Sequence, residues 1–180
     1  MRILYRVRQF WHLLTAIPNP EDLVRMRQIL TKDLQLLFLR QHASEQTHSL
    51  EILSQLLEQG EIQHDLLVAA LIHDIGKIHH PLNAWERVEI VLGRALFPKQ
   101  AKAWGNEKPQ GWKRPFVIAE QHSLWGAKMA AQAGASPLTT TIIRRHHEVL
   151  KLNSAEDKLS DPLSYEDQLI LKLQVLDNHY

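Results

Sequence analysis

Apolar residues recur along this chain at the three- and four-residue spacing of helices, and few segments alternate as strands do. Proline and glycine interrupt the pattern at Pro18-Asn19-Pro20 and at Gly60. The pattern predicts helices over residues 1–15, 21–30, 32–40, 44–59, 63–73, 84–97, 115–133, 137–149 and 165–179. Residues 98–114 are rich in Lys, Gly, Pro and Trp, and residues 153–162 are polar, so both segments are predicted to be irregular. We therefore expect an all-α protein of about eight or nine helices.

The segment 63–73 is apolar on nearly every face, which is typical of a helix at the centre of a domain. It leads directly into His73 and Asp74. Gly76 follows, and it suits the left-handed residue that closes many helices. Gly126 lies one turn after His122 and is expected to leave open space beside that imidazole.

Polar residues with metal-binding side chains occupy core-facing positions of several predicted helices: His48, His73, Asp74, His122, His146 and Asp177. One histidine on an apolar face is more often a hydrogen-bonded core residue, and one aspartate near a helix end is usually a cap. Four histidines and two aspartates cannot easily satisfy one another without a cation, because the carboxylates repel. The set therefore predicts a metal site to which several helices contribute ligands.

Composition limits the class of protein. A chain of 180 residues fits one domain with a substantial core, and its net charge of +1 gives no support for binding duplex nucleic acid. The absence of cysteine excludes disulfides, thiolate catalysis and zinc–thiolate sites, and it agrees with a cytoplasmic protein.

The N-terminal segment 1–15 has the pattern of a basic amphipathic helix. It is too short and too charged to span a bilayer, and it lacks the pattern of a signal peptide, so no transmembrane segment is expected. Contact with a membrane surface is one interpretation. Packing on the domain, or on a partner subunit in a homo-oligomer, is the favoured one.

The ordered set of ligands, with the sequence LLVAALIHDIGK at residues 66–77, resembles the HD-domain phosphohydrolase superfamily. The most similar subgroup has the HDIG box and two additional histidines. The resemblance covers residues 42–180 and leaves 1–41 as N-terminal helices that pack on or extend that domain. After His146-His147-Glu148 the chain reads Val-Leu-Lys-Leu, where cyclic-dinucleotide phosphodiesterases of the HD-GYP type carry Asp-Gly-x-Gly-Tyr-Pro. That specificity is therefore not expected.

The resemblance implies an HD-domain, PDEase-like helical bundle that binds one or two divalent metals. It implies hydrolysis of a small phosphate ester by metal-activated water, with a nucleotide as the favoured substrate. By position, His48, His73, Asp74 and Asp177 would hold one metal, and Asp74 would bridge to a second metal at His122 and His146. Imidazole and carboxylate ligands suit Mn, Fe, Co, Ni, Zn or Mg.

Two further residues are candidates for contact with the substrate. Lys77 lies one turn after Asp74 and could reach a phosphate oxygen, or it could be a cation that favours a helix C-terminus. His147 could donate to the substrate, bind metal or support a ligand. Asp74 and Lys77 are thus the candidate catalytic residues, and Lys77 and His147 the candidate substrate-binding residues. Tryptophans in 98–114 could stack on a base or anchor a loop to the core.

Three functions remain open at this point. A metal-dependent phosphohydrolase is favoured because every ligand that the resemblance implies is present. The alternatives are a metal-binding regulatory or scaffold module with little turnover, and a di-iron oxygenase that uses the same ligands.

Overall fold

The structure, a computed structural model, describes residues 17–150 and 163–177. Within these ranges it contains nine α-helices, two short 3₁₀ helices and no strand, which confirms the predicted all-α class. The predicted helix 1–15 and the predicted loop 153–162 lie outside the described residues. In chain order the elements are α2 (Pro20–Ile29), α3 (Lys32–Leu39), α4 (Ala43–Glu58), α5 (His64–Ile72), η1 (Ile75–His79), α6 (Ala84–Leu96), α7 (Pro98–Gly105), η2 (Gly111–Lys113), α8 (Arg114–Gln132), α9 (Pro137–Arg145) and α10 (Tyr165–Asp177).

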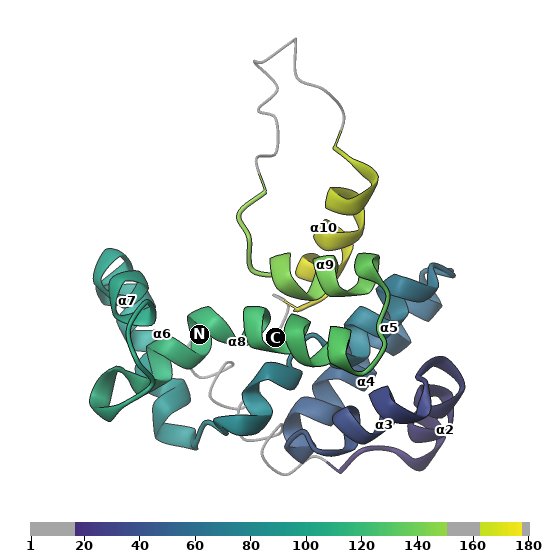
Figure 1. The fold of residues 1–180 in the computed structure, drawn as a ribbon, viewed down its shortest axis with the longest axis horizontal. Coiled ribbons are helices and arrows are strands. Elements are labelled where there is room, and N and C mark those ends of the chain that lie inside the picture. Colours follow the sequence, from purple (N-terminus) through teal and green to yellow (C-terminus); the bar gives the residue numbers. More distant parts are fainter. Residues whose placement is uncertain (1–16, 151–162, 178–180) are drawn as a thin grey trace, which may run out of the picture.

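Helix α5 is the centre of the core, as its uniform apolar pattern predicts. Every residue from Leu66 to Ile72 is buried, and α4, α9 and α10 pack around this helix (Figure 1). The described N-terminal helices α2 and α3 add Met26, Leu34 and Phe38 to the same buried cluster. Each such side chain contributes about 1.5–3 kcal/mol when it is fully buried.

Helix α8 connects two parts of the molecule. It packs against η1 and α9 on one side and against helices α6 and α7 on the other (Figure 1). We call residues 84–105 the α6–α7 arm. The arm is held to α8 where Arg94 Nη2 donates to the carbonyl oxygen of Ala119 at 3.1 Å, and where the ring of Phe116 fills the space beside Gly93.

The prediction that residues 98–114 are irregular is wrong, because this segment contains α7 and η2. Pro98 stands in the first turn of α7, where its missing N–H has no helical partner to lose. Ala101 is buried, and the ring of Trp104 packs edge-on against Phe116 with 4.9 Å between centroids. The Lys, Gly and Pro content of the segment concealed this helical spacing of apolar residues.

Gly76 does not have the left-handed conformation that we predict from the sequence. The positive φ angles among described residues belong to Gly60, Gly111 and Gly134. A Cβ atom at Gly76 would instead overlap the carbonyl oxygen of His122 and lie 2.8 Å from the backbone nitrogen of Gly126. A Cβ at Gly126 would lie 3.1 Å from the nitrogen of Gly76, so Gly126 leaves no open space beside His122. The two glycines allow η1 to lie directly on α8.

The predicted helix 137–149 is shorter in the structure. Helix α9 ends at Arg145, and His146 and His147 occupy the turn that follows. Val149 is 91% exposed and is not part of the buried face. Ser164 caps the start of α10, because the backbone N–H of Asp167 donates to Ser164 Oγ at 3.1 Å. None of the helices that the structure describes has the length and apolar character needed to cross a bilayer.

Candidate metal centre

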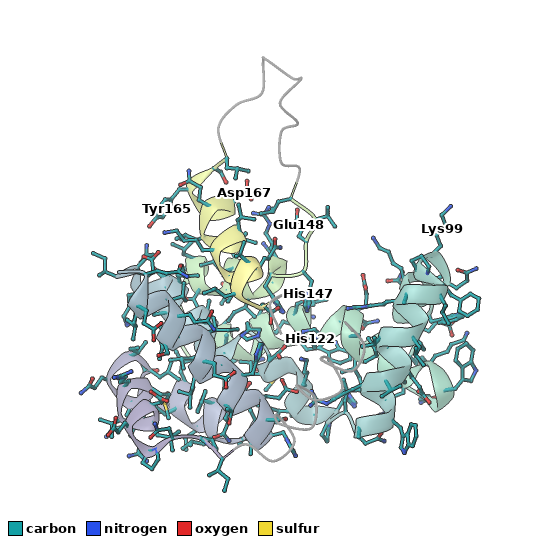
Figure 2. The ribbon with its side chains drawn as sticks, turned by 180° about the vertical axis from the view of Figure 1, so that it is seen from behind. Lys99, His122, His147, Glu148, Tyr165 and Asp167 are labelled. Atoms are coloured by element: carbon teal, nitrogen blue, oxygen red, sulfur yellow. The ribbon has the colours of Figure 1, made fainter. Side chains whose placement is uncertain are left out.

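The six predicted ligands come from α4, α8, α10 and the turns that follow α5 and α9, and the structure brings them together. His73 and Asp74 continue directly from the central helix, so their position is set by the core. Figure 2 shows His122 and His147 between α10 and the α6–α7 arm, which carries Lys99 at its outer end. The side chains of the centre are withdrawn from solvent, with His73, Asp74, His122 and His146 each 4% exposed or less.

One part of the centre is formed by His48, His73 and Asp177. The Nε2 atom of His48 lies 2.9 Å from Asp177 Oδ1, and the Nε2 atom of His73 lies 3.5 Å from the same oxygen. His73 Nε2 also lies 3.6 Å from Asp74 Oδ2. Ligand atoms of His48, His73 and Asp74 are close enough together to hold one ion.

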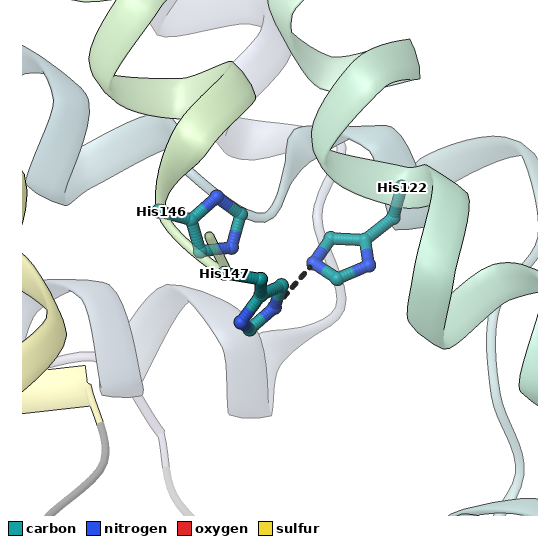
Figure 3. A group of neighbouring side chains, drawn as sticks. All are labelled: His122, His146 and His147. Atoms are coloured by element: carbon teal, nitrogen blue, oxygen red, sulfur yellow. Dashed lines mark hydrogen bonds between the residues drawn. The ribbon is translucent and has the colours of Figure 1, made fainter. Parts of the chain in front are cut away.

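The other part is formed by three histidines. Asp74 Oδ1 lies 3.1 Å from His122 Nε2, so the two oxygens of this carboxylate face different imidazoles. His122, His146 and His147 form a second group that could hold an ion. Figure 3 shows the ring of His147 beside the other two, with its Nε2 atom 3.2 Å from His122 Nε2.

Backbone carbonyl groups fix the orientation of three of the four buried imidazoles. The Nδ1 atoms of His73, His122 and His146 lie 3.0, 2.9 and 2.6 Å from the carbonyl oxygens of Ala70, Ile118 and Ile143. A carbonyl oxygen accepts only, so each Nδ1 must carry the hydrogen. In the neutral ring the lone pair is then on Nε2, which points into the centre. This is the arrangement of a histidine metal ligand supported by its surroundings.

The residues present fit a cation. Among the described residues, His146 Nε2 is buried without a hydrogen-bond partner, and His73 Nε2 comes no closer than 3.5 Å to a carboxylate oxygen. Unsatisfied buried polar atoms are costly. Asp74 Oδ1 lies 3.1 Å from His122 Nε2, so in the neutral ring a lone pair faces a carboxylate oxygen. A bound cation would satisfy all of these atoms, and the donor set of imidazole and carboxylate suits a divalent transition metal or Mg.

The protonation of the centre shows how strongly it attracts positive charge. Burial alone would lower the pKa of His73, but the carboxylates of Asp74 and Asp177 outweigh it and raise the pKa to about 9. Burial would raise the pKa of Asp74, and Lys77 and His73 instead hold it well below its usual value. Burial lowers the pKa of His146, and the neighbouring histidines lower it further. The centre thus combines an anionic side at Asp74 and Asp177 with a neutral imidazole at His146.

Lys77 is part of an ion-pair chain beside the centre. Its Nζ atom lies 2.6 Å from Asp74 Oδ2 and 3.6 Å from Glu45 Oε2, and Glu45 Oε1 accepts from Arg87 Nη2 at 2.5 Å. The location of Lys77 beside Asp74 agrees with the predicted proximity of these two residues. Its ammonium group therefore lies at the edge of the site and is not directed away at a helix end.

Two charged residues beside the centre, Glu45 and Arg87, are not among those that the sequence pattern predicts. Glu45 lies three residues before His48, on the same helix, and it is only 6% exposed. A charged residue one turn from a candidate ligand on a buried face was a signal available in the sequence. Nothing in the sequence indicated Arg87, because its pairing with Glu45 depends on the position of α6 relative to α4 in the folded protein.

His147 differs from the buried histidines. Within the described residues its ring makes one hydrogen bond, to His122, and no carbonyl group fixes its Nδ1 atom. The residue as a whole is exposed. Desolvation of its ring and the proximity of His122 nevertheless lower the pKa of His147, which keeps the imidazole neutral.

Comparison with known proteins gives one match. A family model described as HD domain matches residues 46–177, which include all six predicted ligands. Neither the comparison with curated proteins nor the comparison with solved structures finds a match.

Proposed function

This chain belongs to the HD domain family, and from that premise we propose that it is a metal-dependent phosphohydrolase acting on a small phosphate ester, with a nucleotide as the favoured class. The observation that carries the proposal is the position of Asp74. One of its oxygens faces His122 and the other faces His73, at the junction of the two groups of candidate ligand atoms. A carboxylate in this position can bridge two cations.

Each residue of the centre has a proposed role. His48, His73, Asp74 and Asp177 would hold one ion, and Asp74, His122 and His146 would hold another. The carbonyl groups that fix His73, His122 and His146 orient their Nε2 atoms before any ion binds. This support lowers the cost of assembling the site.

Bound divalent cations would supply an activated water and neutralise charge on the phosphoryl oxygens. The chain itself would position the ester. Lys77 Nζ, beside Asp74 Oδ2, can donate a charge-assisted hydrogen bond to a phosphoryl oxygen. His147, exposed and neutral, has one N–H, which can donate to the same group when a cation holds His122 Nε2. Lys77 and His147 thus remain the proposed substrate-binding residues, and Asp74 and Lys77 the proposed catalytic residues.

The proposal is tested by elemental analysis of the purified full chain, followed by assays of phosphate release. The protein should be loaded separately with Mn, Fe, Co, Ni, Zn and Mg and offered phosphomonoesters, phosphodiesters and nucleoside polyphosphates. We expect release with at least one pairing of metal and substrate. Asp74→Asn should lose bound metal and lower the rate about 100-fold or more, since even outer-shell changes cost 10–100-fold.

The matched control is Asp33→Asn, at an acidic position in the first turn of α3, outside the centre. It should retain the metal content and the rate of the wild type. Absence of phosphate release with every metal and every class of ester would contradict the proposal. Full activity of Asp74→Asn would contradict the bridging role of this residue.

A further inference from the structure

A cavity of about 170 Å³ lies beside the metal centre, on the side of Lys77. It is partly open to solvent and is lined by residues 40–45 up to the start of α4, by residues 74–82 and by Arg87 of α6. Its walls include Asp74 and Lys77. It is several times larger than the roughly 30 Å³ that one water molecule occupies in the liquid. A substrate whose phosphoryl group lies at Asp74 could therefore extend into it.

The charge of this cavity favours an anion. Its cations are Arg40, Lys77 and Arg87, and its carboxylates are Glu45 and Asp74. Both oxygens of Glu45 are already used, one by Arg87 and the other by Lys77. When Asp74 binds metal, its charge is directed to that ion, and the excess of positive charge in the cavity increases.

Glu45 holds Arg87 at the cavity wall. A carboxylate that is 6% exposed is costly to bury unless it is paired, and the 2.5 Å contact with Arg87 Nη2 provides that pair. The side chain of Arg87 is 24% exposed, and its Nε atom has no hydrogen-bond partner in residues 17–150 and 163–177. Its guanidinium group, fixed along one edge by Glu45, keeps a donor unused.

Gln41 provides an unsatisfied acceptor at the same cavity. Its amide nitrogen donates to the carbonyl oxygen of Leu71 at 3.3 Å, while its Oε1 atom is buried and has no partner within the part of the chain that the structure describes. The residue is 5% exposed and lines the cavity. An unused donor on Arg87 and an unused acceptor on Gln41 indicate a ligand with both kinds of group, because buried polar groups in native proteins are normally satisfied.

We propose that this cavity binds a second, non-reacting phosphate group of the substrate. Arg87 is the cation that contacts this phosphate, Gln41 accepts from a hydroxyl of the same ligand, and Glu45 is the positioning residue for Arg87. The planar guanidinium fork suits phosphate oxygens better than a point charge does. The inference rests on the proposed function, since it places the reacting phosphoryl group at Asp74. It makes a compound with two phosphate groups a better ligand than the matching monophosphate.

The test compares AMP with ADP and with adenosine 3′,5′-bisphosphate. Their dissociation constants are measured by calorimetric titration of the metal-loaded full chain at one ionic strength, and each nucleotide is checked for hydrolysis afterwards. The wild type should bind at least one of the two compounds with two phosphate groups, ADP or adenosine 3′,5′-bisphosphate, more tightly than AMP. Arg87→Gln should reduce this preference about tenfold or more, as expected for one lost charge-assisted contact.

Arg144→Gln is the matched control, because Arg144 is exposed on α9 and does not line the cavity. It should keep the preference of the wild type. Glu45→Gln releases Arg87 but leaves the charge of Arg87 in place, and it should reduce the preference for the second phosphate. Arg87→Lys should recover only part of the preference that Arg87→Gln loses. Circular dichroism establishes that each variant is folded, and Arg87→Lys replaces Arg87→Gln in the comparison if the latter does not fold.

A wild type without any preference for a second phosphate would overturn the inference, as would an Arg87→Gln variant with the full preference. Failure of the proposed function has a different signature. In that case the metal-loaded wild type would release no phosphate from any ester, whatever its order of nucleotide affinities.

Discussion

The backbone of Gly76 lies in direct contact with the backbone of His122, with no room for a side chain between them. This contact joins η1, which continues from Asp74 and carries Lys77, to α8, which carries His122. The 3.1 Å separation of Asp74 Oδ1 and His122 Nε2 therefore depends on a glycine two residues after Asp74.

We expect Gly76→Ala to destabilise the protein by about 3 kcal/mol or more, because the added methyl group meets backbone atoms that cannot rotate away. The displacement of η1 from α8 should also weaken metal binding. Urea unfolding measures the free energy of unfolding, and elemental analysis measures the metal retained after dialysis.

Gly134→Ala is the control for this substitution. Gly134 has a φ of +82° and open space around its Cβ position, so alanine costs about 1 kcal/mol through backbone strain alone. That variant should bind metal as the wild type does. An unchanged free energy of unfolding in Gly76→Ala would show that the contact of η1 with α8 is not tight in solution.

The periodicity of apolar residues was sufficient to predict most helices and the central position of α5. The same periodicity placed six potential ligands on core-facing positions, because a polar residue that interrupts an apolar stripe must point where the stripe points. His48 and Asp177 are 129 positions apart in the chain, yet the structure brings their side chains within 2.9 Å of each other.

Other features of the site could not be predicted because they depend on how helices pack. The pairing of Arg87 with Glu45 joins residues 42 positions apart, and neither residue interrupts a long apolar run. From the sequence we predict a left-handed φ angle at Gly76, and the structure does not have it. The glycine is required instead because α8 lies too close for a side chain at this position. Local patterns describe a helix end well but carry no information about the element that lies against it.

Lys77→Met should lower kcat/KM for phosphate release by about tenfold, the effect of one lost charge-assisted contact. The free energy of unfolding should fall as well, because Asp74 and Glu45 both lose a cation. Steady-state kinetics measures the first effect and urea unfolding the second. Lys99→Met, at an exposed position in α7, should change neither quantity. A Lys77→Met variant that loses stability but keeps its kcat/KM would assign this lysine a structural role alone.

His146→Ala and His147→Ala should have different effects. The ring of His146 is held by the carbonyl group of Ile143 and presents a buried, unsatisfied Nε2, so its loss should reduce the bound metal. His147 lacks such support and is exposed, so its loss should raise KM while the metal content stays at the wild-type value. Elemental analysis and steady-state kinetics on the same samples distinguish the loss of metal from the rise in KM. A loss of metal from His147→Ala would instead make this residue a ligand with His122 and His146.

Metal binding should release protons, and the metal-free protein should lose stability as the pH rises. The pKa of His73 is raised to about 9, above its ordinary value of 6.5, because Asp74 and Asp177 favour the protonated ring. The stabilisation by this proton is complete below pH 6.5 and is lost as the pH increases to about 9. A pKa of about 9 in place of 6.5 corresponds to about 3 kcal/mol in the free energy of unfolding. His146 has a lowered pKa and Lys77 a raised one, so their contributions to the pH dependence of stability fall below and above this pH window.

Urea unfolding of metal-free protein between pH 6.5 and 9 measures this decrease, and His73→Gln should show a flatter profile. The same proton competes with the cation for His73 Nε2, so metal affinity should rise over the same window. Calorimetric titration of metal in two buffers with different ionisation enthalpies should show about one proton released near pH 7.5, since His73 is then protonated in the metal-free state. A metal affinity independent of pH across this window would contradict binding at His73, because a cation that coordinates this nitrogen must displace its proton.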